Sequence, residues 1–297
     1  MHKSICLVLI LALLASCNNK SDQKDSGTDS VAADNTPPLI NYNVVQTFPH
    51  DTNAYTEGLL FHDGQLYEAT GTEPDMPAAR RSLFGMVDLH TGKIEPKVEL
   101  DRKKFFGEGI TFLNGKVYQL TYKTKTGFVY DAKTFRKLEE FTFPSVEGWG
   151  MTTDSTHLIM SDGTSNITFL DPTSSRPVET RIVYNDKDSV VKTMNSFKLV
   201  RILGVTDNNG PVSNINELEL IHGFLYANQW TTNYILKIDP SSGKVVGKLD
   251  LTSLANEARN KYPESDTMNG IAYDAATGKI YVTGKLWPNI YEIRFPL

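Results

Sequence analysis

Five short strings, well separated along the chain, each open with an acid or an amide and continue with apolar residues. Their first residues are Glu57, Glu108, Glu147, Glu217 and Asn269. Carboxylates brought together raise one another's pKa, so such a set must share protons, pair with cations or bind a metal. One of these acids is therefore a candidate general base. The others are candidates to accept backbone N–H bonds at strand ends.

Tryptophan is confined to three positions, and each stands at an end of one of the repeated segments that carry the acids. These positions are Trp149, Trp230 and Trp287. Stacking against a substrate explains this clustering better than core packing does, although the repeat alone would also place them together. Lys285 lies two residues before Trp287. It is a candidate partner for one of the acids or a candidate donor to a substrate.

Several classes of chemistry are disfavoured by what the sequence lacks. It contains no His-Glu-x-x-His string, no nucleophile elbow around a serine and no phosphate-binding glycine loop. The formal charge is −5 and no basic stripe is present, so we expect no nucleic-acid partner. A zinc enzyme, a covalent hydrolase and a nucleotide-dependent enzyme are all poorly supported.

The elements that carry the acids repeat. Each opening residue begins a strand that is followed by a turn, a second strand, a third strand ending in an Asp-centred turn, and a fourth strand. The opening residues are 51, 39, 70 and 52 positions apart, which brackets the roughly 40–50 residues of propeller repeats. The sequence therefore predicts an all-β protein, a five-bladed β-propeller, whose first strands converge on one axis.

Two parts of the repeat are irregular. In the third copy we expect a fourth strand at 178–184 and an inserted loop or small hairpin at 186–212, which explains the step of 70 residues. The fifth copy ends after its third strand, 290–295. We therefore expect the N-terminal strand, 41–49, to close the last blade and to remove an open sheet edge.

The N-terminus has the pattern of a signal peptide. Lys3 precedes an apolar run at 5–15, and Leu14-Ala15-Ser16-Cys17 resembles the bacterial lipobox. Residues 1–17 are thus predicted to be a lipoprotein signal with lipidation at Cys17, unless the cysteine is coincidental in a secretory signal. Residues 18–40 are predicted to be a flexible tether, and 41–297 the propeller. We expect a bacterial cell-envelope protein, lipid-anchored and periplasmic or outer-membrane-associated.

From about Tyr42 to Ile293 the chain resembles the plant and bacterial glutaminyl-peptide cyclotransferases. The resemblance rests on these strings: Phe106-Gly107-Glu108-Gly109, Asp162-Gly163-Thr164-Ser165, Asn216-Glu217-Leu218-Glu219, Tyr226-Ala227-Asn228-Gln229-Trp230 and Gly284-Lys285-Leu286-Trp287-Pro288. It implies a five-bladed propeller that converts N-terminal glutamine of peptides to pyroglutamate and releases ammonia. No cofactor is required, and peptides or proteins with N-terminal glutamine are the expected partners of a monomer.

The resemblance also implies roles for particular residues. Four are expected to be catalytic: Glu108, Asn216, Trp230 and Lys285. Four are expected to bind substrate: Trp149, Tyr122, Glu57 and Trp287. Glu108 would carry a proton from the attacking amine to the leaving nitrogen, without a covalent intermediate. The sequence departs from the family where Tyr122 replaces a frequent tryptophan, Ile215 replaces leucine, and Glu57 stands where some members have glutamine.

Two other functions remain open at this stage. A calcium-dependent, lactonase-like propeller would use hard oxygen ligands around the axis, for which Glu57, Asn216, Glu217 and Asn269 qualify. The same oxygens are compatible with a structural cation on the propeller axis. A propeller that binds peptides without turning them over is the second alternative. Tightly bound calcium would favour the lactonase-like propeller. Absence of turnover on glutaminyl dipeptides would favour the propeller that only binds peptides.

Replacing Cys17 by serine is expected to leave the domain folded and to release it from membranes, because the packed domain begins only after the tether. Fractionation of cells followed by detergent extraction measures this. If the variant partitions with membranes as the parent does, Cys17 is not the anchor.

Overall fold

The computed structural model describes residues 36–184 and 188–297. The predicted signal peptide, Cys17 and most of the predicted tether lie outside these residues. Within the described part the protein is all-β, with one α-helix and otherwise strands and their connections. No described helix is long and apolar enough to cross a membrane.

Three sheets of the described domain have four strands each, all antiparallel. The first contains β2 (Thr56–His62), β3 (Gln65–Thr70), β4 (Leu83–Asp88) and β5 (Lys93–Glu99). The second contains β16 (Ile215–Ile221), β17 (Phe224–Gln229), β18 (Tyr234–Ile238) and β19 (Val245–Asp250). The third contains β20 (Met268–Asp274), β21 (Lys279–Gly284), β22 (Asn289–Arg294) and β1 (Asn43–Pro49).

A larger sheet of eight strands completes the arrangement. Its first half contains β6 (Gly107–Leu113), β7 (Lys116–Thr121), β8 (Gly127–Asp131) and β9 (Lys137–Thr142). Its second half contains β10 (Met151–Thr153), β11 (Leu158–Ser161), β12 (Asn166–Tyr184) and β13 (Asp188–Gly204). The halves join where β13 pairs in parallel with β9, at Asn195 opposite Phe141 and Ser196 opposite Thr142.

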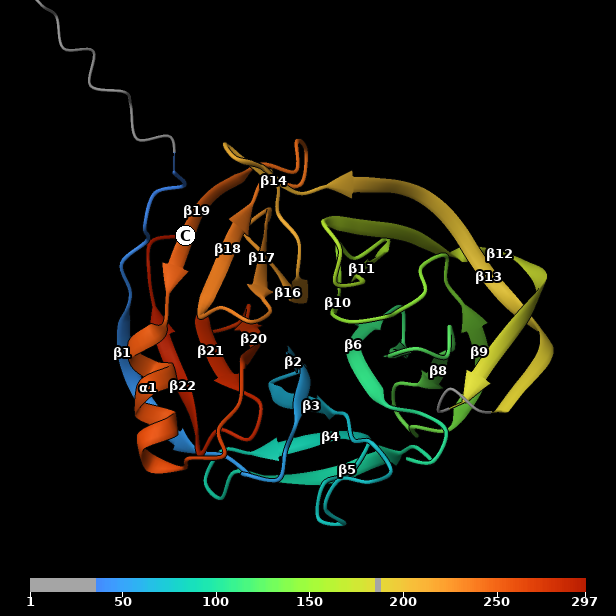
Figure 1. Cartoon of the computed structure of the whole chain (residues 1–297), viewed down its shortest axis with the longest axis horizontal. Helices are drawn as coiled ribbons and strands as arrows, with labels where there is room; N and C mark the ends of the chain where they lie inside the picture. The colour runs from blue at the N-terminus through green and yellow to red at the C-terminus, as the bar shows by residue number, and fades with distance from the viewer. Residues whose placement is uncertain (1–35, 185–187) are drawn as a thin grey trace, which may run out of the picture. The chain divides into compact units, whose positions relative to one another are not determined.

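The strands that open the five sequence repeats contact one another in a closed cycle. β2 contacts β6, β6 contacts β10, β10 contacts β16, β16 contacts β20, and β20 contacts β2 again. Figure 1 shows these strands facing a common centre, with the remaining strands of each sheet farther out. Apolar clusters fill the space between neighbouring sheets, as where Ile159, Phe169, Leu218 and Leu225 pack together. The side chains at the starts of the inner strands are thereby held near one another.

The N-terminal strand occupies the predicted place. β1 pairs antiparallel with β22, from Asn43 opposite Arg294 to Pro49 opposite Asn289, and Figure 1 shows blue β1 beside red β22. This prediction is confirmed. Pro38 and Ile40 also exchange backbone hydrogen bonds of 2.9 and 2.8 Å with Lys248. The packed domain therefore begins a few residues before position 41, where the predicted tether ends.

The insertion in the third repeat differs from its prediction. β12 and β13 form one long antiparallel ribbon, and the predicted strand 178–184 is its outer part, paired with 188–194. The fourth strand of this sheet is instead the end of β13, which returns to pair Leu203 with Ile167. The Asp-Pro signal at Asp171 produces a register shift within β12, not a chain reversal. A two-residue hairpin, β14 (Thr206–Asp207) with β15 (Gly210–Pro211), follows.

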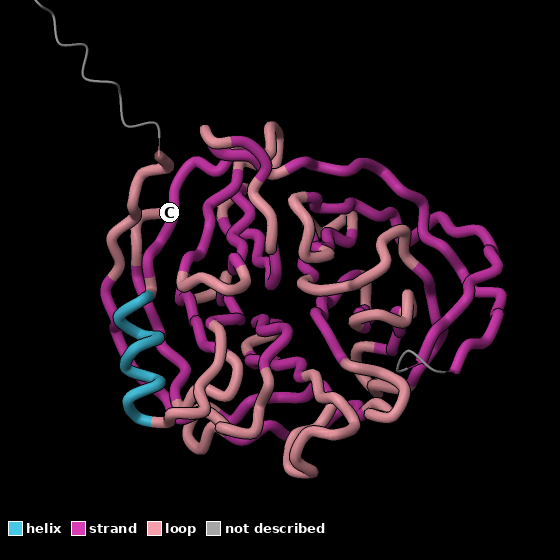
Figure 2. Tube along the Cα trace, viewed as in Figure 1, coloured by secondary structure: helices cyan, strands magenta, loops and turns pink. Residues whose placement is uncertain are grey.

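The helix α1 (Thr252–Lys261) was not predicted. It follows β19 and presents Leu254, Ala255 and Ala258 to the apolar cluster that also contains Trp287 and Tyr291. Figure 2 shows this helix at the periphery of the described domain, beside the sheet that contains β1 and β22. The spacing of the three apolar residues gives one buried helical face, which a search for strand periods overlooks.

Removing residues 41–49 is expected to destabilise the whole domain, because β22 would be left with an unpaired edge and the ring of sheets would open. We expect insolubility, or a fall in melting temperature of about 10 °C or more, since 1 kcal/mol corresponds to about 2–4 °C in domains near this size. Thermal melts of chains beginning at residues 41 and 50 measure the effect. Equal melting temperatures would show that β1 is dispensable.

Candidate active site

A small cavity of about 200 Å³ lies where the inner strands begin. Eleven residues line it: Tyr55, Glu57, Glu73, Met76, Phe106, Glu108, Tyr122, Trp149, Asn216, Trp230 and Lys285. Seven of the eight predicted catalytic and substrate-binding residues are among them. Glu57, Glu108, Asn216 and Lys285 are buried, whereas the aromatic residues are partly exposed. The cavity thus has a polar floor and an aromatic rim.

The same local irregularity places the floor residues. Four of the inner strands shift register against their partner strand at their first residues. These shifts fall between Thr56 and Gly58, Gly107 and Ile110, Ile215 and Leu218, and Met268 and Ile271. Each one frees the acids and amides from the regular alternation of the strand, as β-bulges beside active sites commonly do. The glycines after Glu57 and Glu108 fit because neighbouring inner strands approach closely.

Glu57 and Lys285 form a buried ion pair at the centre of the floor. Lys285 Nζ donates to Glu57 Oε1 and Oε2 at 2.5 and 2.7 Å, and Asn269 Nδ2 donates to Oε2 at 3.4 Å. The ammonium also lies 4.4 Å from the ring centroid of Tyr55, a cation–π contact. Burial raises the pKa of Glu57 to about 7 although Lys285 opposes the shift. The charged state of this acid therefore depends on its lysine.

Glu108 is the second acid of the floor and has a different environment. Only 4% of the residue is exposed, and its Oε2 has no hydrogen-bond partner among the described residues. Burial, together with the nearby charge of Glu57, raises the pKa of Glu108 well above that of an ordinary glutamate, while Lys285 opposes this. Asn216 Oδ1 is likewise buried and unpartnered in the described part of the chain. Two polar groups in one cavity are thus left for a ligand to satisfy.

The remaining acids of the predicted ring have structural partners. Glu217 accepts hydrogen bonds from the backbone N–H groups of Leu59 and Ile271, at 3.4 and 2.8 Å, and so links β16 to β2 and β20. This confirms backbone capping as the role of one axial acid. Glu147 accepts the Nε1–H of Trp149 at 2.9 Å. No group of three or more acids, histidines or cysteines is placed to hold a metal within residues 36–184 and 188–297.

Aromatic side chains form the rim. The rings of Trp149 and Trp230 meet edge to face with centroids 5.5 Å apart, and Trp149 lies directly over Gly163. A Cβ on Gly163 would come within 2.5 Å of that indole. Phe106 contacts Tyr122 with centroids 5.7 Å apart. The rim can therefore enclose an apolar stem while leaving one side open.

Trp287, which was predicted to bind substrate, does not line this cavity. Its side chain is completely buried, belongs to an apolar core cluster and is absent from the cavity lining described above. Leu286 has a φ of 61°, so the chain reverses after Lys285 and folds the indole back beneath Gly284. Trp287 Nε1 donates to the backbone oxygen of Asp266 at 2.9 Å. Its contribution is to support the turn that presents Lys285.

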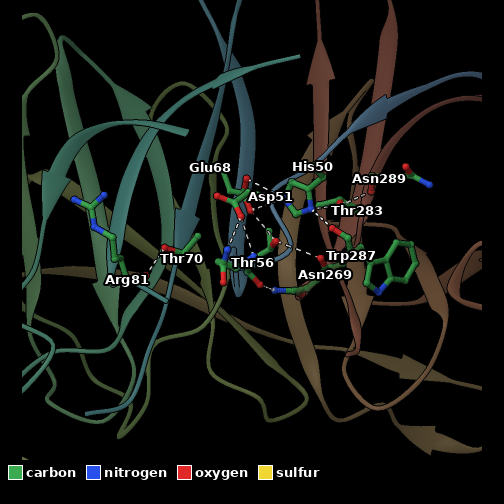
Figure 3. A network of polar contacts seen from close by, with 12 residues as sticks. His50, Asp51, Thr56, Glu68, Thr70, Arg81, Asn269, Thr283, Trp287 and Asn289 are labelled. Carbon is green, nitrogen blue, oxygen red and sulfur yellow. Dashed lines mark hydrogen bonds and ion pairs between the residues drawn. The ribbon is translucent and has the colours of Figure 1, made fainter. Parts of the chain in front are cut away.

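A fully buried network beneath the floor was missed from the sequence, where the histidines carried no signal. His50 Nε2 lies 3.0 Å from Glu68 Oε1, and its Nδ1 lies 2.7 Å from the backbone oxygen of Trp287 (Figure 3). Thr56 donates to the same carboxylate at 2.7 Å. Burial lowers the pKa of His50, but Glu68 more than offsets this, so the pKa is raised overall. The network joins the end of β1 to the residues preceding Glu57 and following Lys285.

Four further residues of the cavity lining were not predicted from the sequence. They are Tyr55, Glu73, Met76 and Phe106. Phe106 stands in the Phe-Gly-Glu-Gly string beside Glu108, which was the one available signal. Tyr55 donates to Asp266 Oδ2 at 3.1 Å and faces Lys285, a pairing that follows only from the way β2 meets the turn after β21.

Buried acids, a buried lysine and unpartnered polar atoms in one cavity define an active site on an all-β scaffold. Comparison with known proteins agrees. A family model described as glutamine cyclotransferase matches residues 8–201 and 180–295. A glutaminyl-peptide cyclotransferase from Arabidopsis thaliana is 34% identical over 254 residues, which are 84% of this chain and 70% of that relative. 

A solved structure provides the corresponding likeness in three dimensions. The crystal structure of Myxococcus xanthus glutaminyl cyclase matches with a TM-score of 0.71 at 30% identity, over 87% of this chain and 98% of that one. The chain therefore belongs to the glutamine cyclotransferase family. It is an enzyme of the glutaminyl-peptide cyclotransferase class.

Replacing Lys285 by methionine is expected to destabilise the protein at pH 8 by about 3–5 kcal/mol, because Glu57 would remain as an uncompensated buried charge. Without the lysine, the pKa of Glu57 rises further above its unfolded value of 4.5. Stability of the variant should therefore be highest at low pH and fall as the pH rises through the folded pKa. Denaturant unfolding at pH 5 and pH 8 measures this.

The matched control is the double variant Glu57→Gln with Lys285→Met, which removes both charges and should recover most of the stability at pH 8. If Lys285→Met loses the same stability at pH 5 as at pH 8, the coupling between Glu57 and Lys285 is contradicted.

Proposed function

We propose that this enzyme converts N-terminal glutamine of peptides to pyroglutamate and that Glu108 moves the proton. The observation that carries the proposal is the unpartnered, buried Oε2 of Glu108 beside the unpartnered Oδ1 of Asn216 and the ammonium of Lys285. A floor of this kind suits a small polar group that both donates and accepts hydrogen bonds. The α-amine and γ-carboxamide of a glutaminyl residue have that character.

The reaction joins two groups of one residue. The neutral α-amine nitrogen attacks the γ-carboxamide carbon, the new C–N bond closes the ring, and the bond to the amide nitrogen breaks to release ammonia. The amine loses one proton and the leaving nitrogen gains one, so a single carboxylate can accept the proton and return it. The raised pKa of Glu108 brings its basicity closer to that of an amine. Similar basicity of Glu108 and the amine favours proton transfer both to and from the carboxylate.

Other floor and rim residues orient the substrate. The Asn216 side chain, the Trp230 indole N–H and Lys285 are positioned around the same cavity as Glu108 and are assigned to hold the carboxamide or to stabilise its oxygen as it becomes anionic. Trp149 and Tyr122 supply an aromatic wall for the methylene stem. Holding the amine and the carboxamide in a ring-closing conformation removes much of the entropic barrier. Glu57 is assigned to keep Lys285 in place.

The reaction consumes neither water nor a cofactor, so we propose that none is required. Calcium is less well supported as a functional ligand, since Glu57 is occupied by Lys285, and Glu217 by two backbone N–H groups. A lactonase of that type would need these oxygens for the metal. We also propose that Cys17 anchors a monomer to the bacterial cell envelope, with contact to the membrane through the lipid alone.

For the architecture, we propose five blades around one axis. The closed cycle of contacts among β2, β6, β10, β16 and β20 supports this count. The eight-stranded sheet then corresponds to two blades, β6–β9 and β10–β13, which the short parallel pairing of β9 with β13 connects at their outer edges. Each blade contributes its first strand to the centre, where the cavity lies.

Glu108→Gln is expected to abolish most turnover while the protein stays folded, because the amide keeps the shape of the side chain but cannot accept a proton. Loss of a positioned general acid–base costs about 10²- to 10⁴-fold in rate. Ammonia release from a glutaminyl dipeptide, with melting curves for both proteins, measures this. Binding of the dipeptide should change much less than kcat.

Glu147→Gln is the control, since this acid contacts Trp149 and lies outside the cavity lining, so the loss should be smaller. Near-parental ammonia release by a folded Glu108→Gln protein would exclude Glu108 as the proton carrier.

A further inference from the structure

One wall of the cavity comes from a loop and not from an inner strand. The connection between β3 and β4, residues 71–82, contributes Glu73 and Met76 to the lining. Both residues are partly exposed, whereas Glu57 and Glu108 are buried. The loop therefore borders the mouth of the cavity, on the side away from the acids of the floor.

A single side chain from the next sheet connection holds this loop. Arg102, which follows β5, donates hydrogen bonds to the backbone oxygens of five loop residues. The acceptors are Glu73 (2.6 Å), Met76 (2.7 Å), Arg80 (3.1 Å), Pro74 (3.3 Å) and Pro77 (3.4 Å). The two terminal nitrogens of the guanidinium divide these acceptors between them. Lysine cannot replace this planar guanidinium, because all of its donors sit on one ammonium nitrogen.

The ends of the loop have their own contacts: Gly71 N–H donates to the oxygen of Tyr55 at 3.1 Å, Leu100 N–H donates to the oxygen of Ser82 at 2.8 Å, and Arg81 pairs with Glu99. Two local turns are closed by the N–H of Met76 to the oxygen of Glu73 at 3.2 Å and by that of Arg80 to Pro77 at 3.0 Å. At the far end, Arg80 pairs with Glu264 at 3.2 Å, where the glutamate side chain is 66% exposed and the pair contributes little. Between these ends, Arg102 is the side chain that binds the backbone oxygens of both Glu73 and Met76.

The volume of the cavity limits how much of a peptide it can hold, and therefore which part of the peptide meets the 71–82 loop. At about 200 Å³ it is smaller than the roughly 300–1,000 Å³ of pockets that enclose a whole drug-sized ligand. A glutaminyl residue whose amine and carboxamide reach the floor fills it, and the peptide must leave through the mouth. We propose that Arg102 is a positioning residue that fixes the 71–82 loop as the contact surface for the residue after the N-terminal glutamine. This inference rests on the proposed function.

The test compares two substrates in the parent and in Arg102→Lys. Glutaminamide has no residue beyond the first, and the tripeptide Gln-Phe-Ala amide places an apolar residue at the mouth beside Met76. For the variant we expect KM for the tripeptide to rise by about tenfold, while KM for glutaminamide and both kcat values stay within about twofold of the parent. Ammonia release gives all four constants.

Arg136→Lys is the matched control, since it makes the same charge-conserving substitution in an exposed turn between β8 and β9, and it should leave the kinetic constants for both substrates unchanged. If Arg102→Lys does not fold, Met76→Ala replaces it and should raise KM for the tripeptide alone. Equal changes for both substrates, or none for the tripeptide, would overturn the role of the loop. If the unsubstituted protein releases ammonia from neither substrate, the proposed function is overturned as well. Failure of the proposed function is thereby distinguished from failure of the loop's role alone.

Discussion

The pairing of Lys285 with Glu57 is the interaction on which the rest of the site depends. Two carboxylates are buried within one small cavity, and in such surroundings one charge raises the pKa of the other. The ammonium offsets part of that cost and lets Glu57 and Glu108 occupy different roles. Because Lys285 comes from the turn after β21 and Glu57 from the start of β2, the pair also fastens the last sheet in the sequence to the first.

The scaffold separates acids that bind the backbone from acids that line the cavity by one structural feature. The register shift at the start of an inner strand exposes two neighbouring side chains, and the partners they meet decide their use. Glu217 finds backbone N–H groups of β2 and β20 and becomes part of the framework. Asn216, the residue before it, meets only the cavity and leaves its oxygen unpartnered in the described structure. Adjacent positions of one bulge thus differ in environment: Glu217 binds the framework and Asn216 lines the cavity.

The parts of the fold and the site that could be predicted are those marked by a repeated sequence pattern; parts marked only by a local pattern were mispredicted. The inner strands, the closing β1 and the floor acids followed from a repeat that recurs at steps of 39 to 70 residues, whereas Asn216 was indicated by the family resemblance. The ribbon of β12 and β13 did not, because Asp171-Pro172 has the same local signature whether it reverses the chain or only shifts its register. Trp287 was misplaced because its proximity to Lys285 in sequence does not reveal the left-handed turn at Leu286. Met76 lines the cavity from a loop that Arg102 binds over a long sequence separation, which no local pattern indicates.

Closure of the ring by β1 also determines the order in which the chain can fold. The strand that Asn43–Pro49 must pair with, Asn289–Arg294, is the last described strand in chain order and is synthesised after all the others. Until it emerges, β1 has no edge to join, and the buried contact of His50 with the backbone of Trp287 cannot form. Contacts of such large sequence separation slow folding and leave strand edges open in the meantime. Lys285 lies only a few residues before this strand, so the active site is also completed late in folding.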